Sequence, residues 1–189
     1  MEADWSALPH DVLAAIFARL PVDELLLSAP GGAGAVCRSW RDAAKDPATW
    51  RSVDMSVMPL NTTRGSTTRI SARSIAMAAV DRSAGQLEAF RGVYLVTDEL
   101  LHTTSPKAAF RSPSLKSLAV TGSNGVTSQG LEAVVDGCPR LECLVVFQCP
   151  DVLVEEALVA KCAQIRLLCL LPSIGQPKVY RRLAGGDDD

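Results

Sequence analysis

The chain has 189 residues, 48% of them hydrophobic and 21% charged, with a formal net charge of −2 at pH 7. This length suits one ordinary domain or two small modules, and the hydrophobic content argues against disorder as the main state. The weakly acidic balance excludes a general attraction for nucleic acid, no apolar run is long enough for a membrane span, and the acidic start is unlike a secretory signal. We therefore expect no nucleic-acid partner, no membrane partner, and a location in the cytoplasm, the nucleus or both.

Three short helices are predicted near the N-terminus. The first, within residues 8–20, has four apolar residues at the spacing of one helical stripe: Leu13, Ile16, Phe17 and Leu20. The second begins near Pro21, with carboxylates in its first turn, and ends at the glycine-rich residues 28–34. The third covers residues 35–44, has Val36, Trp40 and Ala44 on one stripe, and ends before Pro47.

These helices contain more large apolar side chains than they can bury by themselves. A module of this size buries only about 60% of the surface that its unfolded chain exposes. Two tryptophans, Trp40 and Trp50, nevertheless lie within this short stretch of a chain that is poor in aromatic residues. We therefore expect a partner protein to cover the surplus apolar surface.

The order and spacing of these residues resemble an F-box, from Leu8 to Leu25 and again from Val36 to Trp50. The family is a helical module that docks on the Skp-type adaptor of a cullin ubiquitin ligase. A few residues more than usual, around Gly31–Gly34, separate the two parts and are expected to displace the turn into the third helix. The resemblance implies that the following residues divide between the module's own core and the adaptor: Leu8, Pro9, Leu13, Ile16, Phe17, Leu20, Leu25, Val36, Cys37, Trp40 and Trp50.

The same glycines allow a second interpretation, a phosphate-binding loop that opens a helix. No strand is predicted before them, and no Gly-Lys-Ser/Thr follows. We therefore favour a hinge.

Residues 55–70 are polar, contain proline and glycine, and are predicted to be a linker. A helix with Ile75, Ala78 and Ala79 is expected to follow and to cover the first of the repeats in the rest of the chain.

The rest of the chain contains repeats. Segments that begin at residues 87, 115, 141 and 165 share an L-x-x-L-like core and follow one another at intervals of 28, 26 and 24 residues. In the second and third copies a valine and then a leucine recur at matching positions, and Cys149 lies at the asparagine-or-cysteine position. This pattern resembles leucine-rich repeats of the cysteine-containing kind. A single repeat of this type cannot bury its own apolar face, so the stack must be cooperative.

The predicted fold class is α+β, with an N-terminal three-helix F-box followed by a short α/β leucine-rich-repeat solenoid. The expected segments are an F-box at 4–54, a linker at 55–70, a covering helix with about three and a half repeats at 71–175, and a flexible acidic tail at 176–189. This order resembles plant-type F-box/leucine-rich-repeat proteins.

In a stacked array, the third, fifth and seventh residues of each repeat are expected to face one surface of the sheet. They are Ser117, Ala119 and Thr121, then Cys143, Val145 and Phe147, then Leu167, Cys169 and Leu171. This surface becomes apolar toward the C-terminus and should therefore be covered. A bound target protein is one explanation; a tail that folds back or the loss of later repeats is the other.

Nothing in the sequence predicts catalysis, a metal site or a cofactor. The six cysteines form no Cys-x-x-Cys pair and are expected to be reduced, mainly buried thiols. The two histidines, His10 in the first turn of the first helix and His102 in a loop, are expected to be solvated surface residues. The resemblance implies a non-catalytic substrate receptor, which binds a Skp-type adaptor, through it a cullin scaffold, and an unknown target protein. Two alternatives remain open: an F-box protein without a degraded target, and a plain leucine-rich interaction module with a helical cap.

Overall fold

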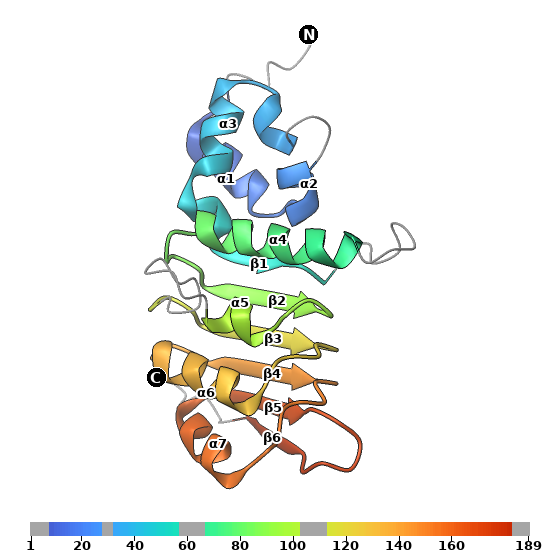
Figure 1. The fold of residues 1–189 in the computed structure, drawn as a ribbon. Helices are drawn as coiled ribbons and strands as arrows, with labels where there is room; N and C mark the ends of the chain where they lie inside the picture. Colours follow the sequence, from blue (N-terminus) through green and yellow to red (C-terminus); the bar gives the residue numbers. More distant parts are fainter. Residues whose placement is uncertain (1–7, 28–31, 57–66, 103–112, 183–189) are drawn as a thin grey trace, which may run out of the picture.

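The chain forms a helical N-terminal module followed by a ladder of short strands (Figure 1). The computed structural model describes residues 8–27, 32–56, 67–102 and 113–182. The helical module consists of α1 (His10–Phe17), α2 (Val22–Leu27), the 3₁₀ turn η2 (Gly32–Ala35), α3 (Arg38–Lys45) and the 3₁₀ turn η3 (Pro47–Trp50). The three predicted helices are therefore present.

The helical module is built around a few large side chains. Leu13 and Phe17, one turn apart on α1, are completely buried. The ring of Trp40 on α3 meets Phe17 edge to face, with 5.3 Å between the ring centroids. The indole of Trp50 is buried, and its Nε1 donates to the carbonyl oxygen of Ala44 at 2.9 Å, so its polar atom is satisfied.

The third helix begins later than predicted. Residues 32–35 form a separate 3₁₀ turn, and Cys37 is extended, with φ −155° and ψ −178°, at the N-cap of α3. Val36 therefore precedes the helix and is exposed, so its expected place on the stripe with Trp40 and Ala44 is wrong. The physical reason is the displaced turn that the additional glycine-rich residues introduce. Gly31 lies outside the described residues.

A strand that the sequence analysis missed joins the helical module to the array. β1 (Ser52–Asp54) pairs in parallel with β2 (Ala89–Val93), and the backbone N–H of Met55 donates to the carbonyl oxygen of Arg91 at 2.8 Å. Met55 is buried, so the predicted linker does not begin there. The expected covering helix is present as α4 (Thr67–Arg82), which begins within the predicted linker. Residues 57–66 lie outside the described residues.

The predicted repeats form a parallel ladder. β2 is followed by β3 (Ser117–Thr121), β4 (Cys143–Phe147) and β5 (Leu167–Leu171), which begin at 89, 117, 143 and 167 and so reproduce the intervals read from the sequence. The side chains at the second position of each strand are buried: Phe90, Leu118, Leu144 and Leu168. Cys149 is also buried, and its Sγ donates to the carbonyl oxygen of Phe147 at 3.4 Å. The short α/β leucine-rich-repeat architecture is therefore confirmed.

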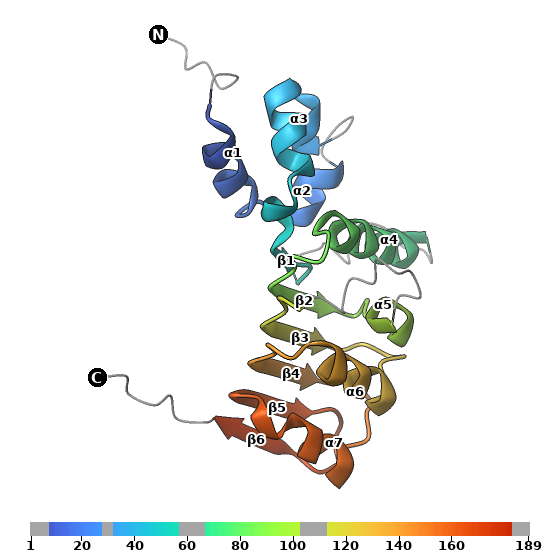
Figure 2. The same ribbon diagram turned by 90° about the vertical axis from the view of Figure 1, so that its left-hand side faces the viewer.

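The helices that the structure describes after β1 all lie on one face of the sheet (Figure 2). After α4 these are α5 (Asp98–His102), α6 (Ser128–Gly137) and α7 (Glu156–Lys161), the last extended by the 3₁₀ turn η4 (Cys162–Gln164). We call the opposite face of the strands the open face. One continuous hydrophobic core runs from Leu13 in α1 to Leu170 in β5, so the helical module and the array are packed as one body.

The C-terminal segment differs from the expected flexible tail. β6 (Val179–Arg182) pairs antiparallel with β5, at the last edge of a six-stranded sheet whose order is β1 to β6. The prediction for 176–189 is therefore wrong for these residues; 183–189 lie outside the described residues. The reason is physical: β5 offers unpaired backbone groups at its outer edge, and Val179 and Tyr180 belong to the residue types that favour strands.

Side-chain hydrogen bonds at one end of the strands tie the first repeat to the second. The Asp98 carboxylate accepts from the backbone N–H of Thr127 at 2.9 Å and from its hydroxyl at 2.7 Å. Thr127 is the N-cap of α6, and its Oγ1 accepts from the N–H of Gly130. A Cβ at Gly130 would lie 2.0 Å from Oδ1 of Asp98. Glycine is therefore required there because the carboxylate fills the space.

This arrangement predicts strong coupling between Asp98 and Gly130. Asp98→Ala should cost about 2 kcal/mol because it leaves the Thr127 donors without their partner. Gly130→Ala should cost about 2 kcal/mol through overpacking against the carboxylate. In the Asp98→Ala background, however, Gly130→Ala should be neutral or stabilising, since alanine favours the helix over glycine by about 1 kcal/mol. The measurement is a double-mutant cycle by urea denaturation; additive costs would contradict the proposed packing.

Candidate functional site

The two histidines and the cysteines show no catalytic arrangement within the described part of the chain. Nε2 of His10 donates to Oδ2 of Asp46 at 2.7 Å, which ties α1 to the turn after α3. This bond, followed by the one from the backbone N–H of Ala48, lowers the pKa of the Asp46 carboxyl. The stability that the carboxylate contributes is present above its ordinary pKa and is lost as the pH falls through the lowered one. His102 is the last residue of α5 and does not lie in the loop where we expected it.

All six cysteines are free thiols. Cys138, Cys149 and Cys162 are buried, and burial raises the pKa of Cys149 and raises that of Cys162 to about 11. A buried thiol with a raised pKa is a poor nucleophile, because the thiolate is the reactive form. Over the described ranges, no group of three or more His, Cys, Asp or Glu side chains could hold a metal ion. Nor does any helix in those ranges have the length and apolar character to cross a membrane.

The structure separates the residues expected at the adaptor contact into three groups. Four are buried in the core: Leu13, Phe17, Leu25 and Trp50. Four are half-buried: Leu8, Leu20, Cys37 and Trp40. Three are exposed: Pro9, Ile16 and Val36. The buried residues therefore stabilise the helical module, and only the other two groups present surface to a partner.

One side of α1 is apolar and exposed. Val12 and Ile16 are 40% and 36% exposed, they are four residues apart, and Pro9 precedes Val12 by three. This spacing places Val12 and Ile16 on one helical face, next to the exposed N-cap residue Pro9, and we call this surface the α1 face. The predicted stripe of Leu13, Ile16, Phe17 and Leu20 did not include Val12 and is wrong in part: Ile16 is exposed beside Val12, and α1 ends at Phe17, before Leu20. A second apolar stripe, offset from the first, was the available signal.

The open face of the sheet is the second candidate surface. Along β3, β4 and β5 the residues expected to face outward are half-buried or exposed, while those between them are buried, so the predicted orientation is confirmed. The strand register places them in continuous rows across the sheet. One row is Thr121, Phe147 and Leu171; a second is Ala119, Val145 and Cys169; the third is Ser117, Cys143 and Leu167.

The strands that the sequence analysis missed extend these rows at both ends. At the first edge, Asp54 of β1 lies opposite Arg91 of β2, and their charged groups are 3.5 Å apart. At the last edge, Tyr180 of β6 lies opposite Cys169 and is 69% exposed, and Arg182 lies opposite Leu167. The folded-back C-terminal strand therefore enlarges the open face and does not cover it. Near the helical module the open face carries the Asp54–Arg91 ion pair. Toward its far end its side chains are mainly apolar, and the ring of Tyr180 is exposed.

These features define the class of the protein: a small helical module joined to a parallel-strand array of the leucine-rich-repeat kind, with exposed apolar surface on both. Residues 5–56 match the model of the F-box-like family. The chain thus contains an F-box-like domain and is a distant homologue of proteins named F-box/LRR-repeat proteins.

Three relatives from Arabidopsis thaliana illustrate this similarity. The chain is 32% identical to putative F-box/LRR-repeat protein 23 over 146 residues, which are 77% of this chain and 30% of that protein. It is 28% identical to putative F-box/LRR-repeat protein 22, over 78% of this chain and 70% of that protein. It is 36% identical to F-box protein SKIP19, over 70% of this chain and 40% of that protein. The chain thus spans well under two thirds of the first and third of these relatives.

The burial pattern predicts which cysteines react. Cys143 and Cys169 are half-buried on the open face, and Cys37, at the N-cap of α3, is also half-buried. A small maleimide should therefore label these three thiols in the folded protein. Cys138, Cys149 and Cys162 should react only after unfolding, because they are buried. Mass spectrometry of peptides, labelled with and without denaturant, measures this. Equal labelling rates for Cys143 and Cys149 in the folded protein would refute the assignment of the two faces.

Proposed function

We propose that this protein is a substrate-recognition subunit of a cullin-type ubiquitin ligase. Its F-box-like domain binds a Skp-type adaptor, and through it a cullin scaffold, while the open face binds a target protein. The observation that supports this proposal best is the α1 face: Val12 and Ile16 are exposed on the domain that matches the F-box-like family. Apolar side chains grouped on one exposed helical face are characteristic of a protein interface.

The chemistry of the open face indicates the kind of target. The row through Phe147 also contains Leu171, and the row through Val145 ends at the exposed ring of Tyr180. An apolar surface with aromatic groups favours a segment with bulky apolar side chains, because burial of such groups supplies most of the binding energy. We therefore propose that the target presents an extended segment of this composition to β4, β5 and β6.

In this mechanism the protein takes no chemical step. It holds the target close to a ubiquitin-loaded enzyme carried elsewhere on the complex, which raises the effective concentration of the reacting groups. The chain then acts only by positioning the target, in the cytoplasm, the nucleus or both. An F-box protein without a degraded target would use the same adaptor contact, while a plain leucine-rich interaction module would not.

The adaptor contact can be tested with purified Skp-type adaptor and the full chain. The double substitution Val12→Ser/Ile16→Ser should weaken binding at least about 30-fold, the effect expected when two interface anchors are lost. Its melting temperature should stay close to that of the unchanged protein because both side chains are already exposed. Binding is measured by calorimetry and folding by circular dichroism.

Ala18→Ser is the matched control, since Ala18 is the exposed C-cap residue of α1, does not belong to the α1 face and should bind normally. If the unchanged chain binds no adaptor, the ligase proposal is wrong and the plain interaction module is favoured. If the chain binds but the α1-face variant binds equally well, the contact lies elsewhere on the domain.

A further inference from the structure

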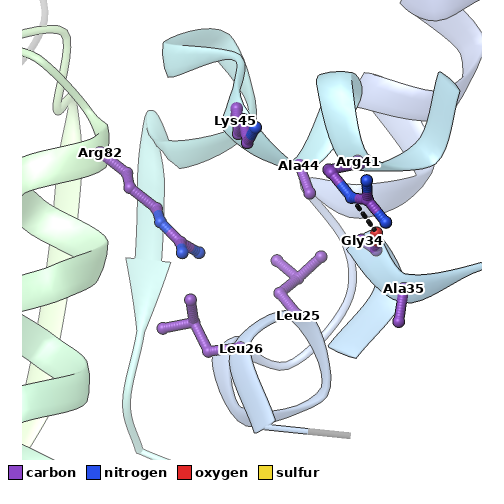
Figure 3. Close-up of a pocket in the computed structure, with 8 residues that line it drawn as sticks. All are labelled: Leu25, Leu26, Gly34, Ala35, Arg41, Ala44, Lys45 and Arg82. Atoms are coloured by element: carbon purple, nitrogen blue, oxygen red, sulfur yellow. Dashed lines mark hydrogen bonds between the residues drawn. The ribbon is translucent and has the colours of Figure 1, made fainter. Parts of the chain in front are cut away.

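A cavity of about 220 Å³ lies where the F-box-like domain meets the array. α2, η2 and α3 form one side of it and the end of α4 forms the other (Figure 3). Pockets that take drug-sized ligands begin at roughly 300 Å³. The size of this cavity therefore restricts its occupant to a small molecule.

Three cationic side chains line this cavity. Arg41 and Lys45 come from α3, and Arg82 is the last residue of α4. No carboxylate is among the lining side chains, and within the described residues none of the three forms an ion pair with Asp or Glu. A cleft lined by one sign of charge concentrates ions of the opposite sign. The cavity is therefore suited to an anion.

Two of these cations are held in place by neighbouring groups. The guanidinium of Arg82 lies over the ring of Trp50, 5.2 Å from its centroid, and points into the cavity (Figure 3). Partial burial there lowers the pKa of Arg82, so an anionic neighbour would favour its charged form. Nε of Arg41 donates to the carbonyl oxygen of Gly34 at 3.2 Å, which fixes the other guanidinium at the opposite wall. Arginines held in this way lose little freedom when they bind an oxyanion.

The remaining wall is apolar. Leu25 and Leu26 of α2 line this wall (Figure 3). Leu25 is already buried in the core, whereas Leu26 is half-buried. A bare inorganic ion would leave Leu26 uncovered, and a ligand with a small apolar group would cover it. The combination of arginines with an apolar wall thus favours an amphipathic ligand over a free ion. Guanidinium groups pair especially well with phosphate oxygens because two N–H groups can bind at once.

We propose that this cavity binds a small phosphate monoester, with the phosphate on Arg41, Lys45 and Arg82 and a small apolar group on Leu26. The site lies in the interface between the F-box-like domain and α4, so an occupant would contact both. Binding to the folded state alone would stabilise the protein by an amount that rises with the logarithm of the ligand concentration above the dissociation constant. The proposal is independent of the adaptor and of any target, and it can be tested on the purified chain.

The experiment compares phenyl phosphate, inorganic phosphate and phenol at constant ionic strength, by calorimetry and by thermal unfolding of the full chain. Phenyl phosphate should bind several-fold more tightly than inorganic phosphate, and phenol should not bind measurably. Arg41→Gln and Lys45→Gln should each weaken phenyl phosphate about tenfold, as expected for the loss of one charged hydrogen bond. Both residues are exposed, so the variants should remain folded.

Two further variants make the test specific. Arg82→Lys keeps the positive charge but loses the planar group over Trp50, and it should also weaken binding. Arg140→Gln, which removes an exposed cation far from the cavity in sequence and is not part of its lining, should leave the affinity unchanged. Equal weakening by Arg140→Gln would overturn the site, because it would show a general charge effect. Equal affinities for phenyl phosphate and inorganic phosphate would overturn the proposed ligand class.

Discussion

The burial of Trp50 is the interaction on which the arrangement of the two halves depends. Its indole N–H is satisfied by the carbonyl of Ala44, and the guanidinium of Arg82 lies over its ring. The chain enters β1 two residues later. The last turn of the F-box-like domain and the first strand of the sheet are therefore fixed by the same side chain. A module too small to bury its own apolar residues gains a core by sharing one with the array.

The regular parts of this fold could be predicted because they repeat. The intervals between leucine-rich segments set the positions of β2 to β5, and the alternation within each strand sets which side chains face outward. The buried members of the α1 stripe, Leu13 and Phe17, followed from helical spacing in the same way. Periodicity succeeds here because neighbouring units bury one another, so the local pattern and the final burial agree.

The parts that were missed are those decided by long-range contact. β1 and β6 are only three and four residues long, and each becomes a strand because an existing strand edge lies beside it. Nothing in such short segments distinguishes them from a linker or a tail. Val12 was missed for a related reason, since a helix with two apolar stripes does not show in its sequence which one faces the core. The cations around the cavity between the F-box-like domain and α4 come from two distant segments, since Arg41 and Lys45 are on α3 and Arg82 ends α4, and only the fold brings them together.

The strand β1 has a geometric consequence for anything bound to the open face. Because β1 belongs to the same hydrogen-bonded ladder as β5, the array cannot swing about a flexible joint relative to the F-box-like domain. Neighbouring strands are about 4.8 Å apart, so the number of strands between the domain and a bound segment sets the height of that segment above the domain. Inserting or deleting one repeat would therefore move a bound segment by one strand spacing relative to the F-box-like domain.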